Sequence, residues 1–314
     1  MSPMKAVRIH TYGSPDVLSF EDAPRPELGE GEVLIRVHAT SINPFDSAVR
    51  AGYLAGYLNY HFPLILGTDV SGTIEEMGPG ANHFAPGDSV YARGGVIRDG
   101  AYAEYIVVPA SDIAAKPASL DHIHSAALPH VTLTAWQALY EAAGLSEGQT
   151  VLIHGAAGGV GHIAVQLAKL RGARVIGTAS DYNFEFLRQI GADEVIDYNK
   201  TRFEDVVHDA DVVLDVVGGE TQSRSWAVLK PGGILVSTVE PPSEETAAAH
   251  GVRQYFVASS PPIGEVLAKV AKLVDSGQIK PVVSTVLPLQ EVQMGHQMID
   301  TRHTRGKIVM QVAD

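Results

Sequence analysis

The chain has 314 residues, of which 45% are hydrophobic and 19% are charged, and this predicts a soluble globular protein of about two domains. Its formal net charge of −13 argues against nucleic acid as the main partner, because phosphate backbones are bound by clustered Lys and Arg. The absence of cysteine excludes disulfides, thiolate nucleophiles and Cys-ligated zinc.

Nothing in the sequence predicts secretion or a membrane span. The N-terminus lacks the long apolar core of a signal peptide. No stretch approaches the roughly 18 apolar residues of a membrane helix. We therefore expect a cytoplasmic protein, without membrane partners.

Residues 1–126 have the pattern of short β-strands separated by turns. Gly-Pro-Gly at 78–80 and Pro-Gly-Asp at 86–88 are turn signals between runs with strand propensity. We expect an antiparallel β-domain here. Its predicted strands cover residues 5–10, 33–39, 70–77, 89–92 and 102–108.

The pattern changes near Leu128. Trp136, Leu139 and Tyr140 have helical spacing, and Gly144 can end that helix. Apolar strand-like runs and helical segments then alternate, which predicts a doubly wound parallel sheet of six strands. These strands cover residues 151–153, 174–178, 194–197, 212–217, 234–238 and 255–257.

The last part of the chain is predicted to contain two further helix–strand pairs. Helices are expected at residues 263–276 and 289–301, and strands at 282–287 and 307–312. We expect this segment to return to the N-terminal β-domain. The predicted division of the chain is therefore 1–126, 127–260 and 261–314.

A glycine-rich turn at residues 155–161 lies between a predicted strand and a predicted helix. In this order, a turn and a helix N-terminus bind a dinucleotide pyrophosphate, because backbone N–H groups and the helix dipole favour negative charge. The alternative is a tight turn in any α/β protein. The G-x-G-x-x-G pattern has Ala156 at its first glycine. The predicted cofactor contacts in this turn are Ala157, Gly158, Gly159, Val160 and Gly161.

Motifs along nearly the whole chain carry a family resemblance. They are Asn43-Pro44-Phe45-Asp46, Arg50-Ala51-Gly52, Leu66-Gly67-Thr68-Asp69-Val70-Ser71-Gly72, Pro86-Gly87-Asp88-Ser89-Val90, Gly100-Ala101-Tyr102-Ala103-Glu104-Tyr105, Leu133-Thr134-Ala135, Gly191-Ala192-Asp193 and Ile196-Asp197-Tyr198. In this order and spacing they resemble the zinc-free quinone oxidoreductase branch of the medium-chain dehydrogenase/reductase family. The resemblance implies a GroES-like catalytic domain, a Rossmann domain, a nicotinamide cofactor and a homodimer.

The zinc ligands of related dehydrogenases are missing. Those relatives have a Cys near residues 43–46 and Gly-His-Glu where this chain has Gly67-Thr68-Asp69, and a four-cysteine lobe that is also absent. A site of His and carboxylate stays open, although no histidine spacing indicates one. We expect no metal. Without a Lewis acid, alcohol oxidation is disfavoured and reduction of a quinone or an enone is favoured.

The choice between NADPH and NADH depends on the end of the second Rossmann strand. The small, neutral ending at Ser180, with Tyr198, resembles NADPH-binding members of the family. Asp181 and Tyr182 depart from that pattern, because NADPH-binding members have a Lys or Arg two residues after the Ser, where this chain has Tyr182. Asp181 either accepts ribose hydroxyls and favours NADH, or caps the next helix. We predict NADPH, with NADH as the alternative.

The resemblance also implies residues around the nicotinamide. Thr134 matches a position beside this ring, with a purely structural place in a helix as the alternative. The pocket is expected to be lined after the fifth and sixth strands of the sheet. The residues expected there are Thr238, Val239, Phe256 and Val257.

Asn43 and Tyr53 are the other two candidate catalytic residues beside Thr134. Asn43 either hydrogen-bonds the substrate carbonyl or the nicotinamide ribose, or organises the turn before Pro44. Tyr53 is a ring stacker or hydroxyl donor, or else a rim aromatic like its neighbours in the segment 53–62. Asp46 is expected to orient Arg50 and to serve structure only.

The expected activity is hydride transfer from NADPH to a quinone or an α,β-unsaturated carbonyl compound. Two alternatives remain open. One is an enoyl or alkenal reductase, and the other is an NADPH-binding sensor or structural protein with little turnover. The proton would come from solvent or a tyrosine, with His61 and His130 as further candidates.

Overall fold

The computed structural model describes residues 3–94, 96, 98–258 and 262–313. The chain divides into two compact units. Unit 1 comprises residues 1–130, 262–277 and 281–314, and unit 2 comprises 131–261 and 278–280. The predicted domain boundary at residues 260 and 261 lies outside the described residues. No helix in the described part of the chain is long and apolar enough to cross a membrane.

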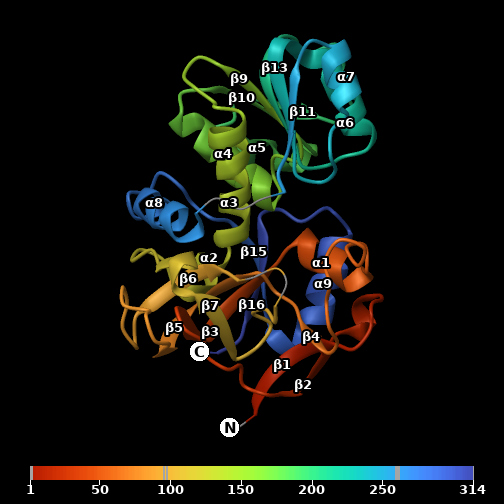
Figure 1. The fold of residues 1–314 in the computed structure, drawn as a ribbon. Helices are drawn as coiled ribbons and strands as arrows, with labels where there is room; N and C mark the ends of the chain where they lie inside the picture. Colours follow the sequence, from red (N-terminus) through yellow and green to blue (C-terminus); the bar gives the residue numbers. More distant parts are fainter. Residues whose placement is uncertain (1–2, 95, 97, 259–261, 314) are drawn as a thin grey trace. The chain divides into compact units, whose positions relative to one another are not determined.

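Unit 1 is built on two β-sheets (Figure 1). The smaller has the strand order β2-β1-β4, and the larger has the order β15-β16-β3-β5-β6-β8, with β7 also paired to β3. All pairs are antiparallel except β15 with β16, which run parallel. The strands are β1 (Met4–Ile9), β2 (Ser19–Ala23), β3 (Glu32–Ile42), β4 (Leu64–Ile65), β5 (Asp69–Met77), β6 (Ser89–Arg93), β7 (Tyr105–Pro109), β8 (Ile113–Ala115), β15 (Val283–Pro288) and β16 (Lys307–Gln311).

Strand β3 is the centre of the larger sheet. It pairs with β5, β7 and β16, and with 11 residues it is the longest strand of this sheet. The register of β16 places Ile308 opposite Ile42. The C-terminal strand is therefore fixed to the strand that leads directly into residues 43–46.

Among the residues that the structure describes, four α-helices of unit 1 accompany these sheets. They are α1 (Pro44–Ala51), α2 (His122–Ala126), α8 (Ile263–Asp275) and α9 (Val292–Asp300). Single 3-10 turns lie at Pro15–Val17, Ala110–Asp112 and Leu289–Glu291. The helix predicted for residues 289–301 is thus a 3-10 turn followed by α9.

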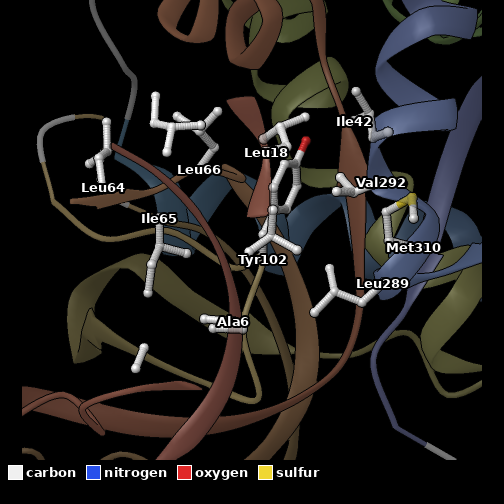
Figure 2. Close-up of a cluster of buried hydrophobic side chains, with 14 of the residues drawn as sticks. Ala6, Leu18, Ile42, Leu64, Ile65, Leu66, Tyr102, Leu289, Val292 and Met310 are labelled. Carbon is white, nitrogen blue, oxygen red and sulfur yellow. The ribbon is translucent and has the colours of Figure 1, made fainter. Parts of the chain in front are cut away.

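The core of unit 1 joins residues that are far apart in the sequence. Figure 2 shows Ala6, Leu18, Tyr102, Val292 and Met310 converging on one apolar cluster. Burial of apolar side chains is the main favourable term in folding. The cluster therefore stabilises the return of the C-terminal segment to the β-sheets.

Unit 2 has a six-stranded parallel sheet of strand order β11-β10-β9-β12-β13-β14. This is the Rossmann order, and it confirms the predicted fold class. The order reverses between β9 and β12, and ligands of such sheets bind at that point, beyond the carboxyl ends of the strands. The strands are β9 (Thr150–Ile153), β10 (Arg174–Ala179), β11 (Glu194–Asp197), β12 (Ala210–Asp215), β13 (Leu229–Ser237) and β14 (Arg253–Phe256).

Helices connect the strands of unit 2 (Figure 1). The first, α3, passes into a π-helix at Gln137–Ala142, and Gly144 follows with a left-handed φ of +63°, as a helix end requires. The α-helices are α3 (Pro129–Trp136), α4 (Gly159–Leu170), α5 (Phe184–Gln189), α6 (Glu220–Ser225) and α7 (Glu244–Ala249), and 3-10 turns lie at Asp181–Asn183, Phe203–Asp205 and Trp226–Val228.

The strand ends differ from the sequence prediction by a few residues, and three strands are additional. β2, β4 and β8 are short, at five, two and three residues. Two or three residues are too few to show a period of two, and β2 is mostly exposed, so no apolar alternation marks it. The strand predicted at residues 102–108 begins only at Tyr105, because Tyr102 lies in a bend and Ala103 forms only an isolated bridge with Ala6.

A substitution in the centre of the parallel sheet tests the assigned core. We expect Val213→Ala to lower the free energy of unfolding by about 2 kcal/mol, because it removes two buried methyl groups and leaves a cavity. Val213 is fully buried, whereas Val206 is 54% exposed. Urea denaturation should therefore show a much smaller loss for Val206→Ala. Equal losses in the two variants would contradict the assigned core.

Candidate active site

The Asn-Pro-Phe-Asp motif begins helix α1. Asn43 is the N-cap residue, Pro44 occupies the first helical position, and the Asp46 carboxylate accepts the Asn43 backbone N–H at 2.8 Å. Proline suits this position because an N–H there would have no partner within the helix. An acidic residue in the first turn stabilises the helix through its interaction with the positive end of the helix dipole. Gly52 ends the helix in a left-handed conformation, with φ of +83°. The motif therefore has a clear local role in starting this helix.

Asn43 also joins a buried polar cluster through its side chain. Its Nδ2 donates to Thr68 Oγ1 at 3.1 Å and to Asp69 Oδ2 at 2.8 Å, and its Oδ1 accepts from Lys307 Nζ. Because an ammonium group can only donate, the orientation of the Asn43 amide is determined. The residue is fully buried and all its side-chain groups are engaged. Its predicted hydrogen bond to a substrate would require one of these contacts to open.

Lys307 is the cation of this cluster. Its Nζ donates to the Ile42 carbonyl at 3.0 Å, to Asn43 Oδ1 and to Asp69 Oδ2 at 3.3 Å. The side chain is only 3% exposed. Three acceptors therefore match the three donors of the ammonium group.

Asp69 is the matching anion. Its Oδ2 accepts from Ser41, Asn43 and Lys307, and its Oδ1 accepts the His130 backbone N–H at 2.6 Å. Burial alone raises the pKa of Asp69, but Lys307 and the other donors outweigh it and hold the pKa below its usual value. Burial lowers the pKa of Lys307 while Asp69 opposes that change. The pair is thus a buried ion pair with its hydrogen bonds satisfied.

A second buried chain of hydrogen bonds connects Arg50 with Asp46. Arg50 Nη1 lies 3.0 Å from His296 Nδ1, and His296 Nε2 lies 3.2 Å from the Tyr102 hydroxyl. Arg50 can only donate, so Nδ1 is the acceptor and Nε2 carries the proton. Tyr102 in turn hydrogen-bonds Asp46. Burial lowers the pKa of His296 to about 3, which keeps the ring neutral.

This chain corrects the predicted role of Asp46. Arg50 pairs with Asp300 at 2.8 Å and bonds the Gly13 carbonyl, so Asp300 rather than Asp46 orients it. Burial raises the pKa of Asp46 to about 7, and the nearby Asp69 carboxylate contributes to the rise. Asp46 is therefore a carboxyl group that changes charge near neutral pH.

A small cavity of about 20 Å³, with room for about one water molecule, lies against this cluster in unit 1. Its wall is mostly apolar, with a polar side formed by Asp46 and Thr68. Tyr60, from the predicted aromatic segment, also lines it and donates to the Val96 carbonyl at 2.5 Å. Tyr53 does not line it and is 78% exposed.

The glycine-rich turn of unit 2 connects β9 to α4. Gly155 has a left-handed φ of +58°. A Cβ at Gly161 would lie 2.3 Å from the Gly155 carbonyl oxygen, so only glycine fits there. At Gly158 the same contact would be 3.3 Å, and the backbone is extended. The first N–H groups of α4 point out of the helix without partners within it, which suits a pyrophosphate.

The other residues predicted to contact the cofactor also follow strand ends of unit 2. Because the strands are parallel, their carboxyl ends share one edge of the sheet with the glycine-rich turn. At this edge Asp215 accepts the backbone N–H groups of Val217 and Gly218 and the Ser237 hydroxyl. The residues that follow the strand ends are Ser180, Tyr198, Thr238 and Val257, with Val239 one position later and Phe256 as the last residue of β14.

Lys200 is a candidate cofactor residue that the sequence analysis missed. Ser180 Oγ donates to the Tyr198 hydroxyl at 2.8 Å, and Lys200 Nζ lies 2.5 Å from Asp181 and 3.1 Å from Asp197. The resemblance implies a Lys or Arg at position 182, two residues after Ser180, where this chain has Tyr182. In the structure the positive charge near Asp181 comes instead from Lys200, in the loop after β11. In the sequence, the only sign of this residue is that it lies two positions after Tyr198.

Two further candidates, His130 and Thr134, belong to α3, and His154 directly follows the end of β9. Thr134 lies in unit 2, in the second turn of α3, because that helix begins at Pro129. His154 is buried between Thr178 and Ser225 hydroxyls. Burial lowers the pKa of His130 to about 4, which makes it a poor proton donor at neutral pH. Within the described residues, no three His, Asp or Glu side chains are grouped to hold a metal ion.

The raised pKa of Asp46 predicts a pH-dependent stability. The ionisable groups whose charges interact with that of Asp46 are Asp69, Lys307, Tyr60 and Tyr102. The pKa of Asp46 is higher in the folded than in the unfolded protein. The contribution of Asp46 to the free energy of unfolding is therefore fully present below about pH 4, and it is lost as the pH rises through about 7. Asp46→Asn removes this dependence.

We therefore expect Asp46→Asn to gain stability relative to the unmodified protein as pH increases from about 4 to about 8. Urea denaturation across that range measures the difference. Asp16→Asn, at an exposed position, is the control and should show no comparable trend. A constant difference for Asp46→Asn would mean that Asp46 is already ionised at low pH.

Comparison with known proteins identifies the family. Residues 29–118 match the family model "Alcohol dehydrogenase GroES-like domain", and residues 190–310 match "Zinc-binding dehydrogenase". The chain is 36% identical to the mouse (Mus musculus) protein "NAD(P)H oxidoreductase RTN4IP1, mitochondrial", over 98% of this chain and 89% of the relative. It is 35% identical to the Arabidopsis thaliana "NADPH-dependent alkenal/one oxidoreductase, chloroplastic", over 98% of this chain and 79% of that relative.

Solved structures agree with these matches. The quinone oxidoreductase from Coxiella burnetii has a TM-score of 0.92 and 35% identity, over 99% of this chain and 100% of that one. A mycobacterial quinone oxidoreductase has a TM-score of 0.82 and 30% identity, over 98% and 100%. The chain therefore belongs to the quinone oxidoreductase branch of the medium-chain dehydrogenase/reductase family, as an NAD(P)H-dependent enzyme of that kind.

Proposed function

We propose that this enzyme uses NADPH to reduce a quinone or an α,β-unsaturated carbonyl compound. The observation that carries the proposal is the glycine-rich turn at the carboxyl edge of the parallel sheet, where Gly161 leaves no room for a Cβ. When bound, the reduced nicotinamide supplies a hydride. The residues of the chain bind it, orient it and exclude water.

The fit of a dinucleotide rests on the backbone of the turn. There is space beside the Cα of Gly158. A Cβ added to this residue would have its nearest contact with the Gly155 carbonyl oxygen, at 3.3 Å. The first turn of α4 supplies N–H donors and the positive end of the helix dipole. Ala157 and Val160 would contribute through their backbone only. These features fit a pyrophosphate group.

NADPH rather than NADH is supported by the groups that surround Ser180. The Ser180 and Tyr198 hydroxyls are hydrogen-bonded to each other, and the Lys200 ammonium group pairs with Asp181. A ribose 2′-phosphate would take hydrogen bonds from these hydroxyls and a charge-assisted bond from Lys200. Asp181 opposes this binding by repulsion, so Lys200 must leave Asp181 for the phosphate.

The acceptor is proposed from the chemistry of unit 1 and from the names of the relatives. A hydride acceptor that is already electrophilic needs no Lewis acid, and the region of Asn43 and Asp69 contains an ion pair instead of metal ligands. Relatives with at least 35% identity are named for the reduction of alkenals and enones and of 2-methylene-furan-3-one. A quinone oxidoreductase is among the matching structures.

Other parts of the sequence prediction stay open. The homodimer and the cytoplasmic location remain predictions, and several relatives have mitochondrial or chloroplastic in their names. Asn43, Tyr53 and Thr134 remain the candidate catalytic residues. A sensor with little turnover would bind NADPH but would leave it unoxidised by every quinone and enone offered, which a stopped-flow assay measures.

The glycine-rich turn is tested by a matched pair of substitutions. Gly158→Asp places a carboxylate where the pyrophosphate is expected, and we predict a loss of NADPH affinity of about 100-fold or more. Gly158→Ala adds only a Cβ and should change the affinity by less than about 10-fold. Fluorescence titration of NADPH measures both, and thermal melting confirms folding. Normal binding by Gly158→Asp would exclude this turn as the cofactor site.

The 2′-phosphate site is tested by the ratio of NADPH to NADH affinities. We expect Lys200→Ala to lower the affinity for NADPH by about 10-fold and to leave the affinity for NADH unchanged, because one charge-assisted hydrogen bond to the 2′-phosphate is lost. Asp181→Asn should raise the affinity for NADPH, since it removes a competing anion. Lys169→Ala, which removes the ion pair with Asp193, is the control. An unchanged ratio in Lys200→Ala would exclude this lysine.

A further inference from the structure

Asp215 is a buried carboxylate at the carboxyl edge of the parallel sheet. It is the last residue of β12 and is fully buried. Its Oδ1 accepts the backbone N–H groups of Val217 at 3.0 Å and of Gly218 at 2.8 Å. Its Oδ2 accepts from Gln222 Nε2 and from the Ser237 hydroxyl, both at 3.1 Å. Because donors from separate elements meet on this one side chain, the carboxylate is held in a single position.

These hydrogen bonds connect the loop after β12 with the loop after β13. Ser237 ends β13, and its hydroxyl oxygen accepts the backbone N–H groups of Val239 at 3.3 Å and of Glu240 at 3.5 Å. The Glu240 carboxylate in turn accepts the Gly219 N–H at 2.5 Å. Gly218 and Gly219 have left-handed φ values of +80° and +57°, which glycine adopts without a steric penalty. The two loops therefore form one hydrogen-bonded unit above the buried carboxylate.

The two loops also carry exposed apolar side chains. Val217 is 43% exposed and Val239 is 51% exposed. Val217 Cγ2 lies 3.4 Å from the position that a Cβ added to Gly155 would occupy. Val239 Cγ1 lies 3.2 Å from the corresponding position at Gly218. Val217 thus adjoins the glycine-rich turn, and Val239 adjoins the loop after β12. Apolar side chains beside a few fixed polar groups are typical of sites for an organic ligand.

The strand order indicates which half of a dinucleotide reaches these loops. The glycine-rich turn follows β9, in the middle of the order β11-β10-β9-β12-β13-β14. The proposed 2′-phosphate site at Ser180 and Lys200 follows β10 and β11, which lie on one side of β9. A dinucleotide with its pyrophosphate at the turn then extends its other half to the opposite side, toward β12 and β13. That other half carries the nicotinamide ring.

We propose that Asp215 is a positioning residue for the nicotinamide half of the cofactor. Its hydrogen bonds hold the two loops in one arrangement, in which Val217 and Val239 contact the ring and exclude water from it. Asp215 acts through these loops, because its own oxygens are engaged by the protein. A ring that is held still at the reacting distance transfers hydride faster.

This inference rests on the proposed function for the identity of the ligand. It adds Val217 to the cofactor site, a residue that the sequence analysis placed at the end of a strand. In the structure β12 ends two residues earlier, at Asp215, and Val217 belongs to the loop.

The first test removes one hydrogen bond of Asp215 by the substitution Ser237→Ala. We expect this variant to lower the affinity for NADPH by about 10-fold, because the loop after β13 loses its anchor. Its affinity for 2′-phospho-ADP-ribose, which has the pyrophosphate but lacks the nicotinamide ring, should stay within about twofold. Fluorescence titration and calorimetry measure the two ligands. Ser225→Ala removes a buried hydroxyl that contacts His154 instead, and as the control it should change neither affinity.

A second variant tests the contact with the ring without altering a buried group. Val217→Thr keeps the shape of the side chain and makes it polar, and the exposure of this residue protects the fold. We expect a loss of NADPH affinity of about fivefold and no change for 2′-phospho-ADP-ribose. Val206→Thr, at a 54% exposed position, is the control. Thermal melting confirms that the variants are folded, and Val217→Thr decides the question if Ser237→Ala is not.

Two results overturn the proposal. One is an equal loss of affinity for NADPH and for 2′-phospho-ADP-ribose in Ser237→Ala, which would indicate a structural role alone. The other is an unchanged NADPH affinity in both Ser237→Ala and Val217→Thr.

The positioning role and the proposed function can fail separately. If the unmodified protein reduces no quinone or enone, yet both variants lose affinity for NADPH and not for 2′-phospho-ADP-ribose, the proposed function fails and the positioning role stands. If the unmodified protein reduces enones and both variants bind and oxidise NADPH equally well, the proposed function stands and the positioning role is overturned.

Discussion

The buried ammonium group of Lys307 is the constraint on which unit 1 depends. A charge removed from water must be matched by acceptors, and this one has the Ile42 carbonyl, Asn43 and Asp69. Those acceptors come from β3, from the start of α1 and from β5, whereas the lysine begins β16. The requirement therefore fixes the C-terminal strand against β3, with Ile308 opposite Ile42.

This constraint also explains the chemistry of the region in which related dehydrogenases hold zinc. The ion pair of Lys307 and Asp69 is satisfied internally, so Asn43 is fixed and turned toward Thr68. A second hydrogen-bond chain runs from Arg50 through His296 and Tyr102 to Asp46. One short helix thus joins two buried polar networks, through Asn43 at its N-cap and through Asp46 and Arg50 in its turns.

Unit 2 is organised by a different constraint, which is steric. Gly161 must lack a side chain because the Gly155 carbonyl oxygen lies where its Cβ would be. The close approach brings the N-terminus of α4 to the end of β9, beside the reversal of strand order. Backbone N–H groups and strand ends, rather than charged side chains, then form most of the proposed cofactor site. Lys200 and Asp181 are the exception, since we propose that their charges set the preference between NADPH and NADH.

Local patterns in the sequence determined the parallel sheet, the glycine-rich turn, the family and the class of enzyme, because strand periodicity, turn glycines and motif order are all readable over short windows. Short strands such as β4, with two residues, carry no such pattern. The contact between Asn43 and Lys307 joins residues 264 positions apart, and Lys200 reaches Asp181 across two strand ends. Only the tertiary structure decided these contacts and the exposure of Tyr53, because burial and hydrogen-bond partners depend on which distant strands pair.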